Sequence, residues 1–177
     1  MTQPESEIAS SAVAFAIFAL DRGAEGCDIL HMETILVPVD FSDVTPQVVA
    51  TANRMASAFQ GKVVLLHISE PEPEFIGFEP GPATVRTAVA KDFRGEHHRL
   101  EELKKTFAPG VAVTALHIQG ATVEKILSEA VTQKADIIVI GSHGHGAIYN
   151  LLVGGVTGGV LKAAPCPVVV VPSAKTT

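Results

Sequence analysis

The stretch from Asp136 to Pro172, DIIVIGSHGHGAIYNLLVGGVTGGVLKAAPCPVVVVP, decides the fold of this chain. It opens with one apolar run, Ile137 to Ile140, and closes with another, Val168 to Val171, both typical of buried strands. Seven glycines lie between them. Because glycine is unfavourable inside regular structure, this density indicates positive φ angles or a close approach to another group. A strand leading through glycines to a helix N-terminus presents unpaired N–H groups to an anion, so we expect a phosphate site.

The composition indicates one compact domain of ordinary size. The 177 residues are 47% hydrophobic and 18% charged, which excludes a disordered chain, and the net charge of −6 disfavours a nucleic-acid partner. Cys27 and Cys166 give no disulfide framework, and no apolar run is long enough to cross a membrane. The apolar segment from Ala9 to Leu20 follows an acidic flank, unlike a secretory signal. We therefore expect a cytoplasmic protein with no membrane partner.

Residues 1–31 differ in character from the rest of the chain. A strand pattern begins directly after Met32, in METILVPVD, which makes Met32 a candidate translational start. We interpret residues 1–31 as an N-terminal extension that is disordered or not native, residues 32–173 as the domain, and residues 174–177 as a tail.

Within the domain, apolar runs alternate with amphipathic segments. This order predicts an α/β fold, with a five-stranded, doubly wound, Rossmann-like parallel sheet covered by helices on both faces. The elements expected before the opening stretch are a strand at Ile35–Val39, a helix from Pro46 to Gly61, a strand at Lys62–Ile68, a proline-rich loop at Ser69–Ala83, a helix at Thr84–Phe107, a strand at Val111–Ile118 and a helix with Thr122 as its N-cap.

Ligands of open α/β sheets collect at the carboxyl ends of strands, where the winding direction of the chain reverses. If the first and fourth strands are neighbours, Asp40 and the turn from Gly141 to Gly144 share one crevice. Asp40 can accept a hydrogen bond from a ribose or base, or hold magnesium beside phosphates. Alternatively, it caps the helix that follows it.

Two common phosphate motifs are absent. Gly154 and Gly159 have Walker-A spacing, but Val160 and Leu161 follow where Lys and Ser or Thr are needed. The dinucleotide fingerprint also fails, because Tyr149 stands where its third glycine belongs.

Another pattern does match. The spacing Gly141-x2-Gly144-x9-Gly154 resembles the nucleotide-binding signature of the universal stress protein family. The resemblance extends to ILVPVDFS at 35–42, LLHI at 65–68 and APCPV at 164–168, and covers the chain from Met32 to Pro172.

This resemblance implies a sheet of strand order 3-2-1-4-5, an ATP site, and a homodimer formed through the last strand. A dimer would cover an apolar sheet edge that otherwise invites uncontrolled pairing. The dimer edge implied is Pro167, Val168, Val169, Val170 and Val171. The nucleotide-binding residues implied are Pro38, Val39, Asp40 and Ile68 around adenine and ribose, with Gly141, His143, Gly144, Gly154, Gly155, Val156 and Thr157 around the phosphates.

One residue departs from the family pattern. Gly155 stands where ATP-binding members have Ser or Thr, so a phosphate-facing hydroxyl worth about 0.5–1.5 kcal/mol is lost. The Gly155 N–H and the Thr157 hydroxyl remain available to a phosphate. The departure predicts weakened rather than excluded binding.

Three functions follow from these observations. The first is an ATP-binding, homodimeric stress-response protein, and the second is a nucleotide-independent dimeric interaction module of the same fold. The third is a slow magnesium-dependent ATPase using Asp40, ranked last because no P-loop Lys or oriented general base is evident.

Apart from His143, which is expected to approach a phosphate, the histidines are expected to have structural roles. The pair His143 and His145 lacks further evident ligands, so we expect no metal site formed by the protein alone. His67 is interpreted as a packed, hydrogen-bonded residue, and His97 and His98 as helix residues serving packing and solubility.

Overall fold

The computed structural model of the chain describes residues 32–69, 83–142 and 155–173. The expected N-terminal extension, most of the proline-rich loop and the C-terminal tail lie outside these residues. So does most of the glycine-rich turn after the fourth strand.

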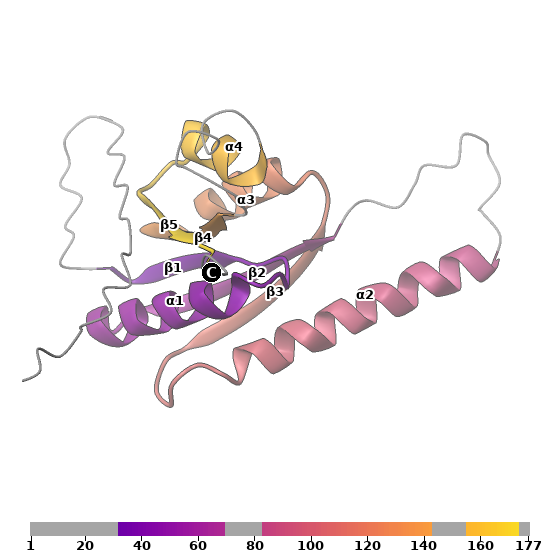
Figure 1. The fold of residues 1–177 in the computed structure, drawn as a ribbon, viewed down its shortest axis with the longest axis horizontal. Coiled ribbons are helices and arrows are strands. Elements are labelled where there is room, and N and C mark those ends of the chain that lie inside the picture. Colours follow the sequence, from indigo (N-terminus) through magenta and orange to yellow (C-terminus); the bar gives the residue numbers. More distant parts are fainter. Residues whose placement is uncertain (1–31, 70–82, 143–154, 174–177) are drawn as a thin grey trace, which may run out of the picture.

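The described residues form the expected alternation of five strands and four helices (Figure 1). All strand pairings are parallel and the order is β3-β2-β1-β4-β5, so the predicted α/β fold and strand order are confirmed. The elements are β1 (Thr34–Pro38), α1 (Thr45–Phe59), β2 (Lys62–Ser69), α2 (Ala83–Lys104), β3 (Val113–Gln119), α3 (Thr122–Thr132), β4 (Ile137–Ser142), α4 (Gly155–Ala163) and β5 (Val168–Pro172).

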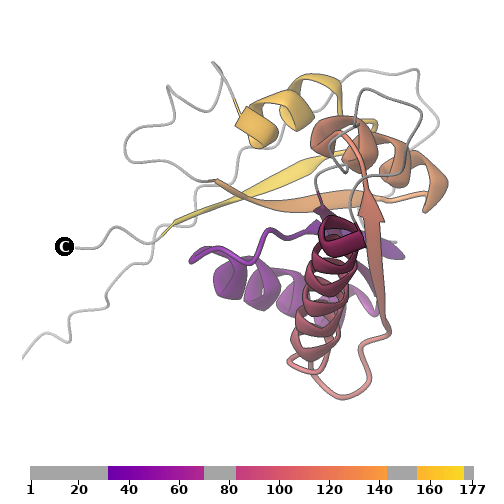
Figure 2. The same ribbon diagram turned by 90° about the vertical axis from the view of Figure 1, so that its right-hand side faces the viewer.

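Helices cover both faces of the sheet, with α1 and α2 on one face and α3 and α4 on the other (Figures 1 and 2). Successive strand side chains point to opposite faces. In β1, Ile35 and Val37 join the core beneath α1 and α2, whereas Leu36 joins the core beneath α3 and α4. β1, β2, β4 and β5 are apolar at consecutive positions because both of their faces are buried, whereas β3, at the edge of the sheet, is only partly buried.

The start of β1 is fixed to the start of β4 by one carboxylate. Asp136 Oδ2 accepts hydrogen bonds from the backbone N–H groups of Glu33 (2.9 Å) and Thr34 (2.8 Å). The Asp136 N–H in turn donates to the Thr34 carbonyl oxygen (2.9 Å). These contacts hold the amino-terminal edge of the sheet, opposite the edge where ligands collect.

Several helix boundaries differ from the sequence prediction, and α1 ends at Phe59, with the left-handed Gln60 as its C-cap, rather than at Gly61. Thr122 is the first residue of α3 and Ala121 is its N-cap, so the prediction that Thr122 caps this helix is wrong. Helix α2 ends at Lys104, and Phe107 is buried in the turn beyond it. Pro46 lies in the first turn of α1, as expected from its missing N–H. None of the described helices combines the length and apolar character that crossing a bilayer would require.

Candidate functional site

The carboxyl ends of β1 and β4 form the switch point of the sheet. From β1 the chain continues to β2 on one side, and from β4 it continues to β5 on the other. The register of β1 with β4 runs through Ile35↔Ile137 and Leu36↔Ile138. The structure therefore brings Pro38, at the end of β1, to the same sheet edge as Gly141, near the end of β4, which is where open α/β sheets bind ligands.

The backbone of Val39 is held at this edge by two contacts. Its N–H donates to the Leu66 carbonyl oxygen (2.8 Å), and its own carbonyl oxygen lies 2.8 Å from His67 Nδ1. Phe41 follows in a left-handed conformation (φ 59°), which is uncommon for a residue with a bulky side chain. Its ring packs on the His67 ring (4.3 Å between centroids), and the Arg99 guanidinium lies 4.3 Å from its centre. Contacts with His67 and Arg99 hold Phe41 in this conformation.

Asp40 is exposed at the crevice and organises the turn between β1 and α1. Its Oδ1 accepts hydrogen bonds from the Ser42 N–H (3.1 Å) and the Ser42 hydroxyl (2.6 Å), with the Thr45 hydroxyl at 3.5 Å. Val44 is the N-cap of α1, so Asp40 stabilises the turn before the helix rather than occupying the cap itself. A carboxylate can accept several hydrogen bonds at once.

Gly141 allows β4 to approach the start of α1. A Cβ atom at this position would lie 2.5 Å from Val44 Cγ1 and 3.2 Å from Val48 Cγ2. Val44 is buried and β-branched, so it has little freedom to move away. Among the described residues, this packing accounts for the glycine.

The first turn of α4 lies beside the end of β4. Gly155 is left-handed (φ +83°), a conformation that favours glycine, and Val156 is exposed. The Thr157 hydroxyl donates to the Gly141 carbonyl oxygen (2.8 Å), which ties α4 to the end of β4. The hydroxyl that the sequence offers to a phosphate is therefore already engaged with the protein backbone.

The remaining predicted residues are more dispersed. Ile68 follows His67 in β2, is half-buried, and packs against the core beneath α3 and α4. His143, Gly144 and Gly154 lie outside the described residues. Of the predicted dimer residues, Val168 to Val171 lie on β5 and Pro167 directly precedes it. β5 pairs with β4 and ends the described order of the sheet.

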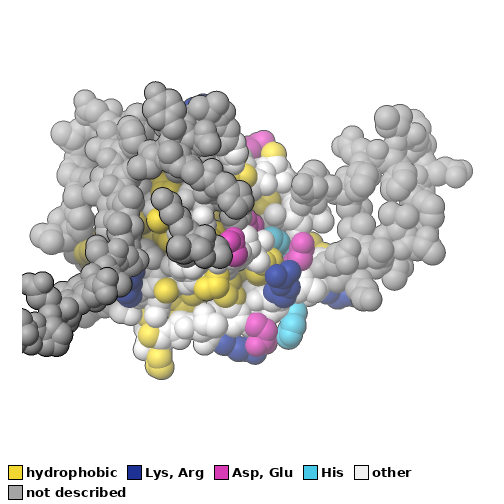
Figure 3. Space-filling model, viewed as in Figure 1, with side chains coloured by type: hydrophobic (Ala, Val, Ile, Leu, Met, Phe, Trp, Pro, Cys, Tyr) yellow, Lys and Arg dark blue, Asp and Glu magenta, His cyan; other side chains and the backbone are white. Residues whose placement is uncertain are grey.

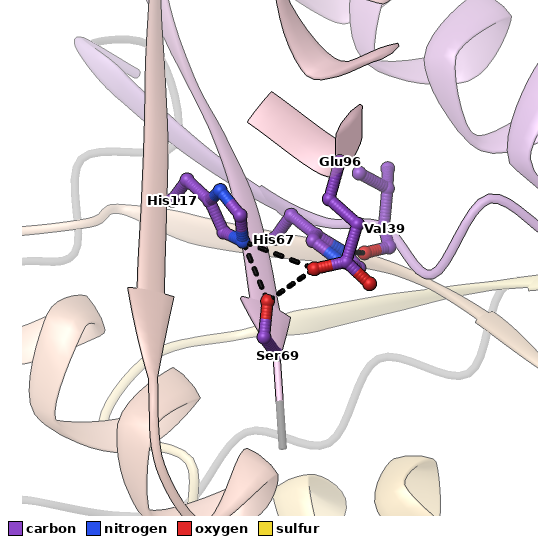
Figure 4. A network of polar contacts seen from close by, with 5 residues as sticks. All are labelled: Val39, His67, Ser69, Glu96 and His117. Carbon is purple, nitrogen blue, oxygen red and sulfur yellow. Dashed lines mark hydrogen bonds and ion pairs between the residues drawn. The ribbon is translucent and has the colours of Figure 1, made fainter. Parts of the chain in front are cut away.

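Sequence reasoning missed a group that we call the histidine cluster: His67, Ser69, Glu96 and His117 (Figure 4). His67 and His117 are register partners on β2 and β3, and Glu96 reaches them from α2. Ser69 Oγ donates to Glu96 Oε2 (2.5 Å) and lies 2.6 Å from His117 Nε2. Glu96 Oε2 also lies 3.4 Å from His117 Nε2 and 3.7 Å from His67 Nε2. One carboxylate oxygen thus faces both imidazoles.

The cluster is buried around its histidines and opens toward solvent at the carboxylate. The side chains of His67 and His117 are 8% and 1% exposed, against 34% for Glu96. Phe93 stacks on the His117 ring, with 3.8 Å between centroids. On the face shown in Figure 3, histidine and acidic side chains lie side by side next to a hydrophobic patch.

Burial and neighbouring charges shift two pKa values in the cluster. Burial, followed by the proximity of His67, lowers the pKa of His117, and these effects outweigh the attraction of Glu96. Burial acts to raise the pKa of Glu96, but the Ser69 hydrogen bond and the two imidazoles together bring it below the usual value. The cluster therefore favours a charged Glu96 beside a neutral His117.

A doubly wound parallel sheet with a crevice at its switch point defines a Rossmann-like α/β protein. The model of the universal stress protein family matches residues 31–172, and the chain therefore belongs to that family.

Relatives in sequence support this membership. The universal stress protein in the QAH/OAS sulfhydrylase 3' region of Thermus aquaticus is 35% identical over 145 residues, covering 78% of this chain and 98% of the relative. The universal stress protein MJ0531 of Methanocaldococcus jannaschii is 30% identical over 144 residues, covering 80% and 82% respectively.

Solved structures agree with the fold. Protein MJ0577 of Methanocaldococcus jannaschii superposes with a TM-score of 0.67 at 27% identity, covering 82% of this chain and 99% of that chain. A universal stress protein in complex with cAMP superposes with a TM-score of 0.58 at 22% identity, covering 81% and 99%.

Proposed function

We propose that the chain binds ATP or a related adenine nucleotide in the crevice between β1 and β4, and acts as a homodimeric, cytoplasmic stress-response protein. The observation that carries this proposal is the meeting of three elements at one sheet edge: the ends of β1 and β4 and the first turn of α4. The first N–H groups of a helix have no partners within it and suit a phosphate. The cAMP complex of a protein with this fold supports an adenine nucleotide as the ligand class to test.

In this proposal each group of residues contacts a different part of the nucleotide. The fixed Val39 backbone and the Ile68 side chain flank the base, and the Asp40 carboxylate accepts from the ribose or lies near a nucleotide-bound magnesium ion. Gly155, Val156 and Thr157 offer backbone N–H groups to the phosphates. Because the Thr157 hydroxyl donates to the Gly141 carbonyl oxygen, the phosphates depend mainly on backbone donors.

Isothermal titration calorimetry with ATP and magnesium tests the proposal on the full chain. We expect saturable binding that Asp40→Asn weakens about tenfold, because a hydrogen bond to a charged group contributes about 1.5–3 kcal/mol. Asp43→Asn is the matched control, since it removes the same charge from the same turn and should leave the affinity unchanged. An absence of heat and of thermal shift at millimolar ATP would contradict nucleotide binding.

A second candidate function is a dimeric interaction module that keeps the fold without nucleotide. Two features favour it: Gly155 lacks the side chain expected there, and the Thr157 hydroxyl already has an acceptor. In that case the native chain should ignore ATP, and Gly155→Ser should create measurable affinity. Because Gly155 has φ +83°, this variant also carries backbone strain, so its stability must be measured alongside. Micromolar affinity of the native chain would exclude this candidate.

A further inference from the structure

We propose that His67, Glu96 and His117 bind one divalent transition-metal ion, with zinc preferred. Their ligand atoms come from β2, α2 and β3 and all lie within 4.8 Å of one another. Two imidazoles and a carboxylate are a common zinc donor set, with water completing the coordination. This proposal is independent of nucleotide binding at the crevice.

The hydrogen bonding of His67 shows which nitrogen is available to a metal. Its Nδ1 faces the Val39 carbonyl oxygen at 2.8 Å, and because a carbonyl only accepts, Nδ1 must carry the proton. In the neutral tautomer with the proton on Nδ1, the lone pair of His67 Nε2 points toward the Glu96 carboxylate, 3.7 Å away. Within the described part of the chain, this buried Nε2 has no hydrogen-bond partner. Two electron-rich atoms facing each other in a buried site favour a cation between them.

The same contact provides the support that metal-binding histidines usually have. A ligating imidazole commonly donates its second N–H to a backbone carbonyl or carboxylate, which fixes the ring and its tautomer. The hydrogen bond from His67 Nδ1 to Val39 has this arrangement. Stacking on Phe93 holds the second imidazole, His117, in place.

Two of the three distances between ligand atoms come close to those of a tetrahedral site. Bonds of about 2.0–2.1 Å at tetrahedral angles place ligand atoms about 3.3–3.4 Å apart. Glu96 Oε2 lies 3.4 Å from His117 Nε2 and 3.7 Å from His67 Nε2. The partly exposed Glu96 can reorient to admit the ion. A metal on His117 Nε2 replaces the contact between this nitrogen and Ser69.

Serine, histidine and glutamate together also suggest a nucleophilic triad, but the connections are wrong. In a triad the carboxylate orients the histidine through the nitrogen remote from the serine. Here Glu96 receives the Ser69 hydroxyl directly, and among the described residues His117 Nδ1 has no partner. The geometry therefore favours coordination over nucleophilic catalysis.

Titration of the chelator-treated full chain with Zn²⁺, followed by calorimetry, tests the proposal. We expect one zinc ion per chain and at least a tenfold loss of affinity in Glu96→Gln, which keeps the shape of a partly exposed side chain. His117→Asn should show the same loss. At the same zinc concentration, zinc should also raise the melting temperature of the native chain more than that of Glu96→Gln.

The chain offers two matched controls. His98→Asn alters an exposed pair, with His98 Nε2 3.9 Å from Glu102 Oε1, and should bind zinc like the native chain. A double variant of His143 and His145 to Asn excludes those histidines as the source of binding and should also retain full affinity.

Substitution of the native chain with Co²⁺ supplies a measurement that requires no variant. A tetrahedral site of nitrogen and oxygen ligands gives intense visible d–d bands without the near-ultraviolet thiolate band of a cysteine ligand. An octahedral spectrum or a thiolate band would overturn the proposal. Failure of the native chain to bind zinc, or native affinity in Glu96→Gln, would overturn it equally.

Discussion

Gly141 shows how one missing side chain positions two elements at the crevice. A Cβ atom there would lie 2.5 Å from Val44 Cγ1, in a region where α1 begins and β4 ends. The glycine is thus explained by protein packing before any ligand is considered. A substitution at this position tests the packing directly.

We expect Gly141→Ala to lower the free energy of unfolding by about 1–3 kcal/mol, the usual result of overpacking a core. Urea denaturation of the full chain measures this change. Gly95→Ala is the control, because Gly95 lies within α2 with nothing within 4 Å of its added Cβ. That variant should be more stable by about 0.5–1 kcal/mol, since alanine favours helix. Equal effects of the two variants would show that Gly141 is not a packing position.

The sequence predicted which residues lie at this edge of the sheet better than it predicted the contacts of their side chains. Pro38, Asp40 and Gly141 stand at the ends of recognisable apolar runs, so their position at one edge follows from strand order. The sequence does not show that the Thr157 hydroxyl donates to the Gly141 carbonyl oxygen, because that bond depends on how α4 returns to the sheet. The N-cap of α3 is Ala121, which makes no side-chain cap hydrogen bond, so side-chain capping preference did not predict it.

The sequences of β2 and β3 contain a pattern that indicates the histidine cluster. Leu66-His67-Ile68 in β2 and Leu116-His117-Ile118 in β3 are the same tripeptide, and parallel pairing puts them in register. Alternation along β2 and β3 then places both imidazoles on the α1 and α2 face. Glu96 carried no comparable signal, because the rotation of α2 above the sheet is set by packing.

The pairing of β1 with β4 depends on Asp136 at the opposite edge. Replacing it by alanine leaves the N–H groups of Glu33 and Thr34 without that acceptor, and we expect a loss of about 1–3 kcal/mol in the free energy of unfolding. Asp136→Asn keeps one acceptor oxygen and should lose less. Urea denaturation of the three proteins gives the comparison. Most surface substitutions change the free energy of unfolding by no more than about 0.5 kcal/mol. If the alanine variant differs from the native chain by no more than this, the Asp136 contact does not stabilise the fold.

At the scale of the whole molecule, β5 is the strand proposed to join two copies. Ile138 N–H donates to the Pro167 carbonyl oxygen, so alternation directs the N–H groups of Val168 and Val170 away from β4. We expect the native chain to have a mass of about 37 kDa in light scattering, twice its 18.5 kDa.

Val170→Pro should shift this mass to that of the monomer, because proline removes an outward N–H group. Val170→Ala loses similar packing but keeps the N–H group, and should remain a dimer. A native monomer, or a dimer that persists in the proline variant, would contradict pairing through β5.

The strand order also has a consequence for the chain as it is made. β1 lies at the centre of the sheet, with β2 on one side and β4 on the other. The contact between Glu33 and Asp136, which links β1 to β4, spans 103 positions of the sequence. At about 5–20 residues per second, synthesis leaves one side of β1 without its neighbour for about 5–20 seconds. β1, β2 and β3 are synthesised during this interval, and the apolar edge of β1 stays open to other nascent chains until β4 follows. Crowding of ribosomes on one message therefore endangers this protein most before β4 emerges.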